Sequence, residues 1–223
     1  MAEQLRAVRT RQAILMAAAK IFEEYGYQAA TISQILSEAG VTKGALYFHF
    51  QSKEDLAQGV LAEQDQNLVP PNRATKIQEL VDAVMLQAHR LATEPIVRAG
   101  VRLTMDQRAQ GLDRSGPFLR WSEVGVHFLQ EAQEQGELLP HVVPAETADV
   151  IVGSFAGVQS MSQAICDYSD LVRRVSALMR HVLPSVVVPS ILASLDLSET
   201  RGATVYAEAL KAAEEQELAG AVG

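Results

Sequence analysis

Residues 31–50 read TISQILSEAGVTKGALYFHF and decide the fold. Thr31, followed three residues later by Gln34, has the spacing of a capping box, which marks the start of a helix. Gly40 is predicted to end that helix, because glycine adopts a left-handed backbone conformation at little steric cost. Thr42 is placed to cap a second helix. The stretch therefore predicts two short helices joined by a tight turn, the arrangement of a helix-turn-helix.

The second helix of this pair is predicted to have an inward and an outward face. Leu46 and Phe50 lie four residues apart and anchor the inward face. Four bulky side chains in a row, at 47–50, cannot all point inward, so at least one of them is expected to be exposed. The side chains left for the outward face are Lys43, Gly44, Ala45, Tyr47 and Phe48. In a helix-turn-helix this face enters the major groove of DNA, although spacing alone also suits helix pairs in other proteins.

Helical periodicity extends on both sides of this stretch. Residues 7–25 carry one apolar stripe that ends at Gly26, and a further helix is expected from about Ser52 to Asn67. The run Pro70-Pro71-Asn72 then breaks the chain and marks the expected domain boundary. Later periodic segments lie at about 75–92, 95–109, 117–136, 145–166, 168–182, 188–196 and 200–218. Alternating strand patterns are almost absent, so we predict an all-α protein.

Charge is distributed unevenly along the chain. The 223 residues carry a net charge of −8, but residues 1–60 hold six basic and six acidic side chains and are neutral. Because an acidic body repels DNA, we expect DNA contact to be confined to the first segment, where Arg6, Arg9 and Arg11 lie close together. The single cysteine, Cys166, permits no intrachain disulfide and fits a reducing cytoplasm. We expect neither a signal peptide nor a membrane-spanning segment.

Residues 31–50, followed by Ser52-Lys53-Glu54-Asp55-Leu56, resemble the DNA-binding domain of the TetR family of regulators. The resemblance covers about residues 8–68 and is most specific at 40–50. It implies a TetR-like fold, with an N-terminal three-helix helix-turn-helix domain at 1–68 and a C-terminal ligand-binding and dimerisation domain at 69–223. The DNA-contact positions that it implies are Thr31, Ser33, Thr42, Lys43, Gly44, Ala45, Tyr47, His49 and Lys53.

A narrower resemblance is to the γ-butyrolactone receptor branch of the family, from Streptomyces. It is carried by Arg6-Ala7-x-Arg9-Thr10-Arg11, the helix-turn-helix, Trp121 and Gly157-Val158-Gln159. It implies a repressor of secondary-metabolism genes that leaves a pseudo-palindromic operator when a small diffusible lactone binds. The effector residues that we expect are Gln64, Met85, His89, Trp121, Val124, Phe155 and Gln159. An antibiotic or drug-like effector remains the alternative.

A homodimer is expected to form through the late helices, at about 145–166 and 186–218. Val150, Ile151, Ser154 and Val158 give one apolar stripe, and Gly153 and Gly157 permit close helix approach. An internal core helix would give the same pattern.

Two rival classes of protein are weighed against the repressor. For an enzyme, the sequence lacks paired metal ligands, a phosphate loop and a nucleophile elbow; the glycines around Ser154 lie on a helical pattern. We therefore expect no catalysis, metal or cofactor. A helical scaffold would not need the arginine cluster beside a neutral domain on an acidic body.

Overall fold

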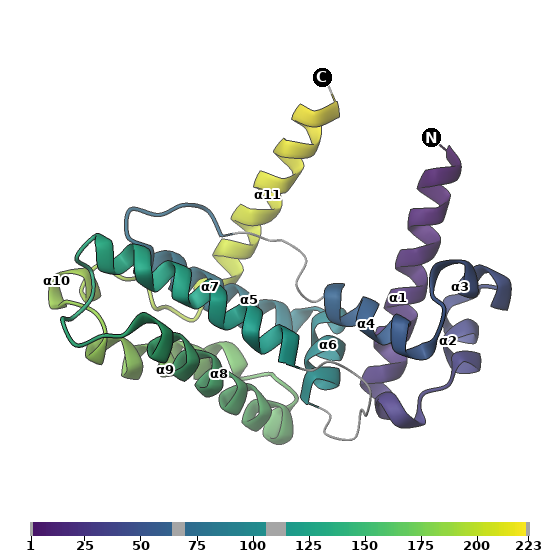
Figure 1. Cartoon of the computed structure of the whole chain (residues 1–223), viewed down its shortest axis with the longest axis horizontal. Helices are drawn as coiled ribbons and strands as arrows, with labels where there is room; N and C mark the ends of the chain where they lie inside the picture. The colour runs from purple at the N-terminus through teal and green to yellow at the C-terminus, as the bar shows by residue number, and fades with distance from the viewer. Residues whose placement is uncertain (1, 64–69, 106–114, 222–223) are drawn as a thin grey trace. The chain divides into compact units, whose positions relative to one another are not determined.

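The computed structural model describes residues 2–63, 70–105 and 115–221, with the side chains of 2–5, 63, 214 and 216–221 set aside (Figure 1). Its elements are helices, and they cluster into two compact units. The first unit holds α1–α4 and α6, and the second holds α5 and α7–α11. The predicted all-α class is confirmed.

The first unit is built from α1 (Ala2–Ala29), α2 (Ile32–Ala39), α3 (Lys43–His49), α4 (Lys53–Glu63) and α6 (Pro95–Met105). The expected end of the first helix at Gly26 appears as a kink inside α1, where this glycine has φ of 75°. The capping box predicted at Thr31 is present, with Gln34 reaching back to the Thr31 N–H. Gly40 takes the left-handed conformation that closes α2.

Helix α6 packs with the first unit, against α1 and α4. The Arg98 Nε donates to the Glu23 carboxylate at 2.7 Å, and Arg102 hydrogen-bonds the Glu23 carbonyl. The sequence placed the boundary at Pro70-Pro71-Asn72 and assigned everything after it to the second domain. The packing differs because α6 supplies an apolar face that α1 and α4 bury, and periodicity does not reveal which element a face will meet.

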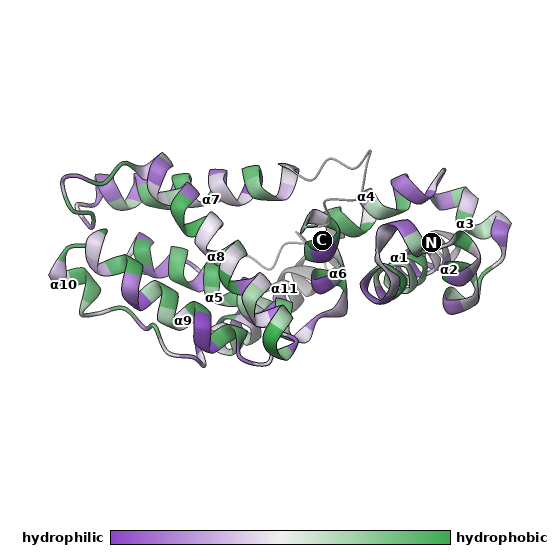
Figure 2. Ribbon diagram, turned by 90° about the horizontal axis from the view of Figure 1, so that it is seen from below, coloured by the Kyte–Doolittle hydropathy of each residue, from purple (hydrophilic) through white to green (hydrophobic). Residues whose placement is uncertain are grey.

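The second unit contains α5 (Lys76–Thr93), α7 (Ser115–Glu134), α8 (Pro144–Cys166), α9 (Leu171–Val182), the 3₁₀ turn η1 (Leu183–Ser185), α10 (Pro189–Leu192) and α11 (Arg201–Ala221). Each of the longer helices carries both hydrophilic and hydrophobic residues along its length (Figure 2). Helix α5 is buried almost throughout and packs against α9 and α11. The helix expected at 188–196 is reduced to one short turn, because the first residues of this apolar run pair with another segment.

That pairing also supplies the N-terminal cap of α5. Val188 N–H donates to the Glu137 carbonyl at 2.9 Å, and Leu139 N–H donates to the Val186 carbonyl at 2.9 Å. The buried Glu137 carboxylate then accepts from two backbone amides of α5, at Lys76 (3.0 Å) and Ile77 (2.9 Å). These amides have no partner within their own helix, so Glu137 satisfies donors that would otherwise be buried without a bond.

Gly202 permits the close approach of α11 to α5. A side chain at this position would overlap the Met85 carbonyl and lie 3.0 Å from the Cβ of His89. Beside it, the His89 ring lies against the Tyr206 ring with centroids 5.1 Å apart.

We predict that Gly202→Ala destabilises the second unit, because the two helices must separate to admit a methyl group. Overpacking of this kind typically costs about 1–3 kcal/mol. Urea unfolding followed by circular dichroism measures the change. Thr204→Ala, at an exposed position on the same helix, is the control and should stay within about 0.5 kcal/mol of the wild type. Equal stability of Gly202→Ala and the wild type would contradict the packing described here.

Candidate DNA interface and apolar pocket

Two buried side chains and one cap fix the orientation of α3. Leu46 and Phe50 are buried as predicted, and they hold the helix against the rest of its unit. Thr42 Oγ accepts from the Ala45 N–H at 3.2 Å and caps the N-terminus. The opposite face of α3 is therefore presented to solvent.

This outward face combines a cation, a small residue and two aromatic rings. Lys43 and Gly44 are exposed, and among the described residues the nearest atom to a methyl group placed on Gly44 is the Thr42 Oγ at 4.0 Å. Tyr47 is 44% exposed, and its ring lies 5.8 Å from the Lys43 ammonium. Phe48 is 80% exposed, which is unusual for a phenylalanine. A surface with these groups can approach base edges and phosphates closely.

Phe48 is absent from the DNA-contact positions that the family resemblance implied. The sequence nevertheless held a signal for it, because residues 47–50 could not all be buried on one helix. In the structure Phe50 takes the inward position and His49 is half-buried, so the exposed rings are Tyr47 and Phe48, of which Phe48 is the more exposed. Its only ring neighbour among the described residues is His49, with centroids 5.0 Å apart.

The other expected DNA-contact positions differ in how available their polar atoms are. Ser33 is exposed at the start of α2, and Ala45 and His49 are half-buried on α3. Thr31 and Thr42 are exposed, but each hydroxyl accepts a capping hydrogen bond. These two threonines therefore hold helix termini in place as well as facing solvent.

Lys53 is engaged within its own unit. Its ammonium donates to the carbonyls of Gln28 (3.2 Å) and Ala30 (2.8 Å) and lies 4.6 Å from the centre of the Tyr27 ring. Burial lowers the pKa of this lysine. A phosphate contact at this position would have to share an ammonium that already binds carbonyls at the end of α1, whereas the Lys43 ammonium lies beside the Tyr47 ring and donates to no carbonyl of the described residues.

The arginine cluster lies at the beginning of α1. Arg6, Arg9 and Arg11 are all exposed, and the Arg11 guanidinium lies 5.3 Å from the centre of the Phe50 ring. Arg11 is thus tied to the residue that anchors α3. The three exposed arginines add positive charge to the same unit that presents the recognition face.

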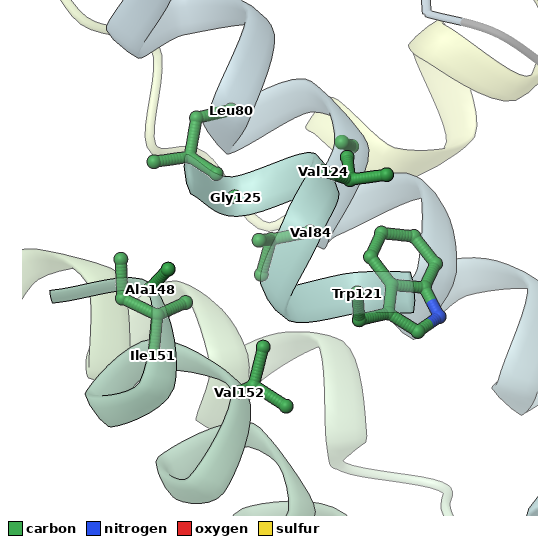
Figure 3. Close-up of a pocket in the computed structure, with 9 residues that line it drawn as sticks. Leu80, Val84, Trp121, Val124, Gly125, Ala148, Ile151 and Val152 are labelled. Atoms are coloured by element: carbon green, nitrogen blue, oxygen red, sulfur yellow. The ribbon is translucent and has the colours of Figure 1, made fainter. Parts of the chain in front are cut away.

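The second unit contains an apolar pocket between α5, α7 and α8 (Figure 3). Its cavity volume is about 20 Å³, room for one water-sized group, and it opens to solvent. The lining residues are Leu80, Ala83, Val84, Trp121, Val124, Gly125, Ala148, Ile151 and Val152. The indole of Trp121 carries the one polar atom among these side chains, and its nitrogen points away from Ile151 and Val152. The pocket therefore suits an uncharged apolar group.

Small residues set how closely the pocket walls meet. A methyl group placed on Gly125 would lie 3.1 Å from the Cβ of Ala148, so α7 and α8 are in near contact there. Beside this contact the Ser122 hydroxyl donates to the Asp149 carboxylate and joins the same two helices.

The structure brings Trp121 and Val124 together in this pocket but places other expected effector residues elsewhere. Met85 and His89 lie on the side of α5 that meets α11, beside Gly202. Phe155 is half-buried and Gln159 is buried on α8, and neither lines the pocket. Gln64 lies outside the described residues. Sequence reasoning missed the small and aliphatic lining residues, because such side chains look like ordinary core.

Comparison with known proteins places these features in a family. Residues 14–60 match the family described as "Bacterial regulatory proteins, tetR family". The chain is 40% identical over 197 residues to the A-factor receptor protein of Streptomyces griseus, covering 87% of this chain and 70% of that protein.

Solved structures agree with that match. The structure of TylP, a TetR regulator from Streptomyces fradiae, matches with a TM-score of 0.83 and 45% identity, covering 92% of this chain and 99% of that one. The structure of a γ-butyrolactone receptor described as ArpA-like matches with a TM-score of 0.67 and 28% identity, covering 94% and 99%. The family and branch that the sequence resembles are confirmed: this chain belongs to the TetR family of bacterial transcriptional regulators, in the branch that includes the A-factor receptor protein.

Proposed function

We propose that the protein is a cytoplasmic repressor that binds operator DNA as a homodimer and leaves it when a small apolar effector, a γ-butyrolactone or a related hormone, binds. The observation that carries the DNA-binding part is the outward face of α3, where an exposed lysine, a glycine and two exposed aromatic rings lie together. The relatives described above, a receptor protein and a TetR regulator, support a regulatory role.

Contacts from this face divide into those that read bases and those that fix position. Lys43 is placed to reach guanine acceptors or a phosphate, and the open space at Gly44 allows the backbone to approach the groove floor. The hydroxyl of Tyr47, the imidazole of His49 and the ammonium of Lys53 are suited to phosphates, which set position without reading sequence. Phe48 adds an apolar ring that can touch a thymine methyl.

The proposed dimer rests on α8. Val150 is 56%, Met161 53% and Ile165 61% exposed, and no atom of the described residues lies within 4 Å of a methyl group placed on Gly153. A surface of exposed apolar side chains and open glycines favours contact with a second copy. Of the stripe predicted from sequence, Ile151 faces the pocket instead, so it is a lining residue in this structure. A two-fold dimer would read two half-sites, as a pseudo-palindromic operator requires.

The effector class follows from the lining of the pocket. Hydrocarbon groups surround it, so a charged ligand would lose its hydration without compensation. The cavity holds only a water-sized group in this structure, so the acyl chain of a lactone has to part α5, α7 and α8 to enter, with the polar head near Trp121 at the pocket edge. An antibiotic or drug-like compound with an apolar body fits the same lining and remains the alternative. The effector must bind the DNA-free form more tightly, since equal affinity for both forms would release nothing.

A gel-shift titration on the DNA upstream of the gene for this protein, with and without an extract that contains lactone hormones, tests the whole proposal. DNA binding that the extract reverses supports it. Binding that the extract leaves unchanged removes the lactone effector and keeps the repressor. Absence of binding to such DNA favours a helical scaffold.

We predict that Lys43→Met weakens operator binding and lowers the dependence of affinity on salt. Loss of one phosphate contact reduces the slope of log K against log salt by about 1, whereas loss of a base contact relaxes sequence preference with little change of slope. Fluorescence anisotropy at several salt concentrations measures both. Lys211→Met, which removes an exposed lysine of the second unit, is the matched control. If both variants bound like the wild type, α3 would not be the recognition helix.

We predict that Trp121→Ala retains operator binding and loses release, because the variant removes the largest side chain of the pocket and keeps the first unit intact. Gel shifts with rising acylated γ-butyrolactone measure release. Trp121→Phe, which keeps an aromatic wall, should retain most of it. Normal release of the alanine variant would show that the effector binds elsewhere.

A further inference from the structure

A buried ionic cluster lies on the opposite side of α5 from the pocket. At its centre is Asp82, which is fully buried. Its carboxylate accepts from Arg73 Nε (2.7 Å), from Gln78 Nε2 (2.8 Å) and from Arg201, whose Nε and Nη2 bind the two oxygens at 2.7 and 2.6 Å. We call Arg73, Asp82 and Arg201 the α5 latch.

The latch and the pocket share one rigid helix. Consecutive helical residues differ by about 100° around the axis, so residues two apart lie on nearly opposite faces. Leu80 and Val84, each two residues from Asp82, line the pocket, whereas Asp82 faces the arginines. Because close-packed helices move as units, a group that enters the pocket and displaces α5 also displaces Asp82.

The two arginines of the latch come from different parts of the chain. Arg201 begins α11, which belongs to the second unit only. Arg73 lies in the segment that joins α4 to α5, ten residues after Glu63, the last residue of α4. Helix α5 holds Arg73 by its main chain also, since the Arg73 N–H donates to the Glu79 carboxylate at 2.8 Å.

Stability alone gives a weak reason for such a cluster. Removing a carboxylate from water carries a large desolvation cost, and well-packed apolar residues in its place often give equal stability. The guanidinium of Arg73 also pairs with Glu208 of α11. The segment that contains Arg73 is therefore bound to two helices of the second unit, α5 and α11. A cluster that joins the pocket helix to the segment leading toward the DNA-binding unit is suited to carrying displacement.

We infer that the Arg73–Asp82 contact is a positioning contact that couples the pocket to DNA release. This inference rests on the proposed function. Filling the pocket displaces α5; Asp82 moves with it, and Arg73 transfers that movement to the segment that precedes α5. Arg201 binds the same carboxylate, but it belongs to α11 and not to the segment that precedes α5. Loss of Arg201 should therefore leave the coupling between pocket and DNA release intact.

The test compares Arg73→Met with Arg201→Met, because each variant removes one arginine and leaves the other to neutralise Asp82. Operator affinity is measured by anisotropy with and without an acylated γ-butyrolactone, and lactone binding is followed separately by the fluorescence of Trp121, the single tryptophan. Arg73→Met should bind DNA and lactone within about threefold of the wild type, with at least about tenfold less release. Arg201→Met should be released like the wild type.

Two results would overturn the inference: normal release of Arg73→Met, or equal loss of release in both variants. A wild type that binds DNA and is not released by the lactone contradicts the proposed effector instead. In that case the coupling role of the α5 latch is tested without a ligand, by filling the pocket with the larger side chain of Val84→Phe.

The filled variant should bind operator at least about tenfold more weakly than the wild type, and adding Arg73→Met should restore binding. Thermal unfolding by circular dichroism shows that each variant is folded at the assay temperature. Val84→Phe that binds DNA normally, or a double variant as weak as Val84→Phe alone, would exclude the latch.

Discussion

The burial of α5 is the constraint on which the second unit depends. A helix enclosed on nearly all sides must either be apolar throughout or find a partner for every polar group it carries. Helix α5 buries Asp82 and Glu79 and exposes its first amides to the interior, so other segments have to supply arginines and a capping carboxylate. Glu137, Arg73 and Arg201 meet these demands from three different parts of the chain. Among the described residues of this unit, those contacts fix where α5 begins and how it lies against α11.

Local rules predicted the first unit well. The caps at Thr31 and Thr42, the glycine at 40 and the buried pair Leu46 and Phe50 all depend on residues within a few positions of one another. These caps and this buried pair could therefore be predicted from local sequence, and the structure confirms them. Family resemblance added the identity of the DNA-binding domain, which spacing by itself left open.

Long-range contacts were beyond the same reasoning. Glu137 caps amides some sixty positions earlier, and Arg201 binds a carboxylate 119 positions away. Periodicity shows that a face is buried and does not say against what. Because packing partners could not be predicted, the sequence analysis assigned α6 to the wrong unit. For the same reason, the residues that it expected to bind one effector lie on two sides of α5. Trp121 and Val124 came together in the pocket, whereas Met85 and His89 turned toward α11.

The position of α6 also has a consequence for how the chain is made. The DNA-binding unit is discontinuous, because α6 reaches α1 and α4 only after the whole of α5 has been synthesised. A nascent or truncated chain that stops at Pro70-Pro71 would leave the apolar faces of α1 and α4 uncovered. Recombination with a single crossover in the segment between α4 and α5 would therefore not exchange one complete unit for another. An exchange that kept the first unit intact would have to include α5, which lies between α4 and α6 in the sequence. It would therefore also transfer one wall of the apolar pocket.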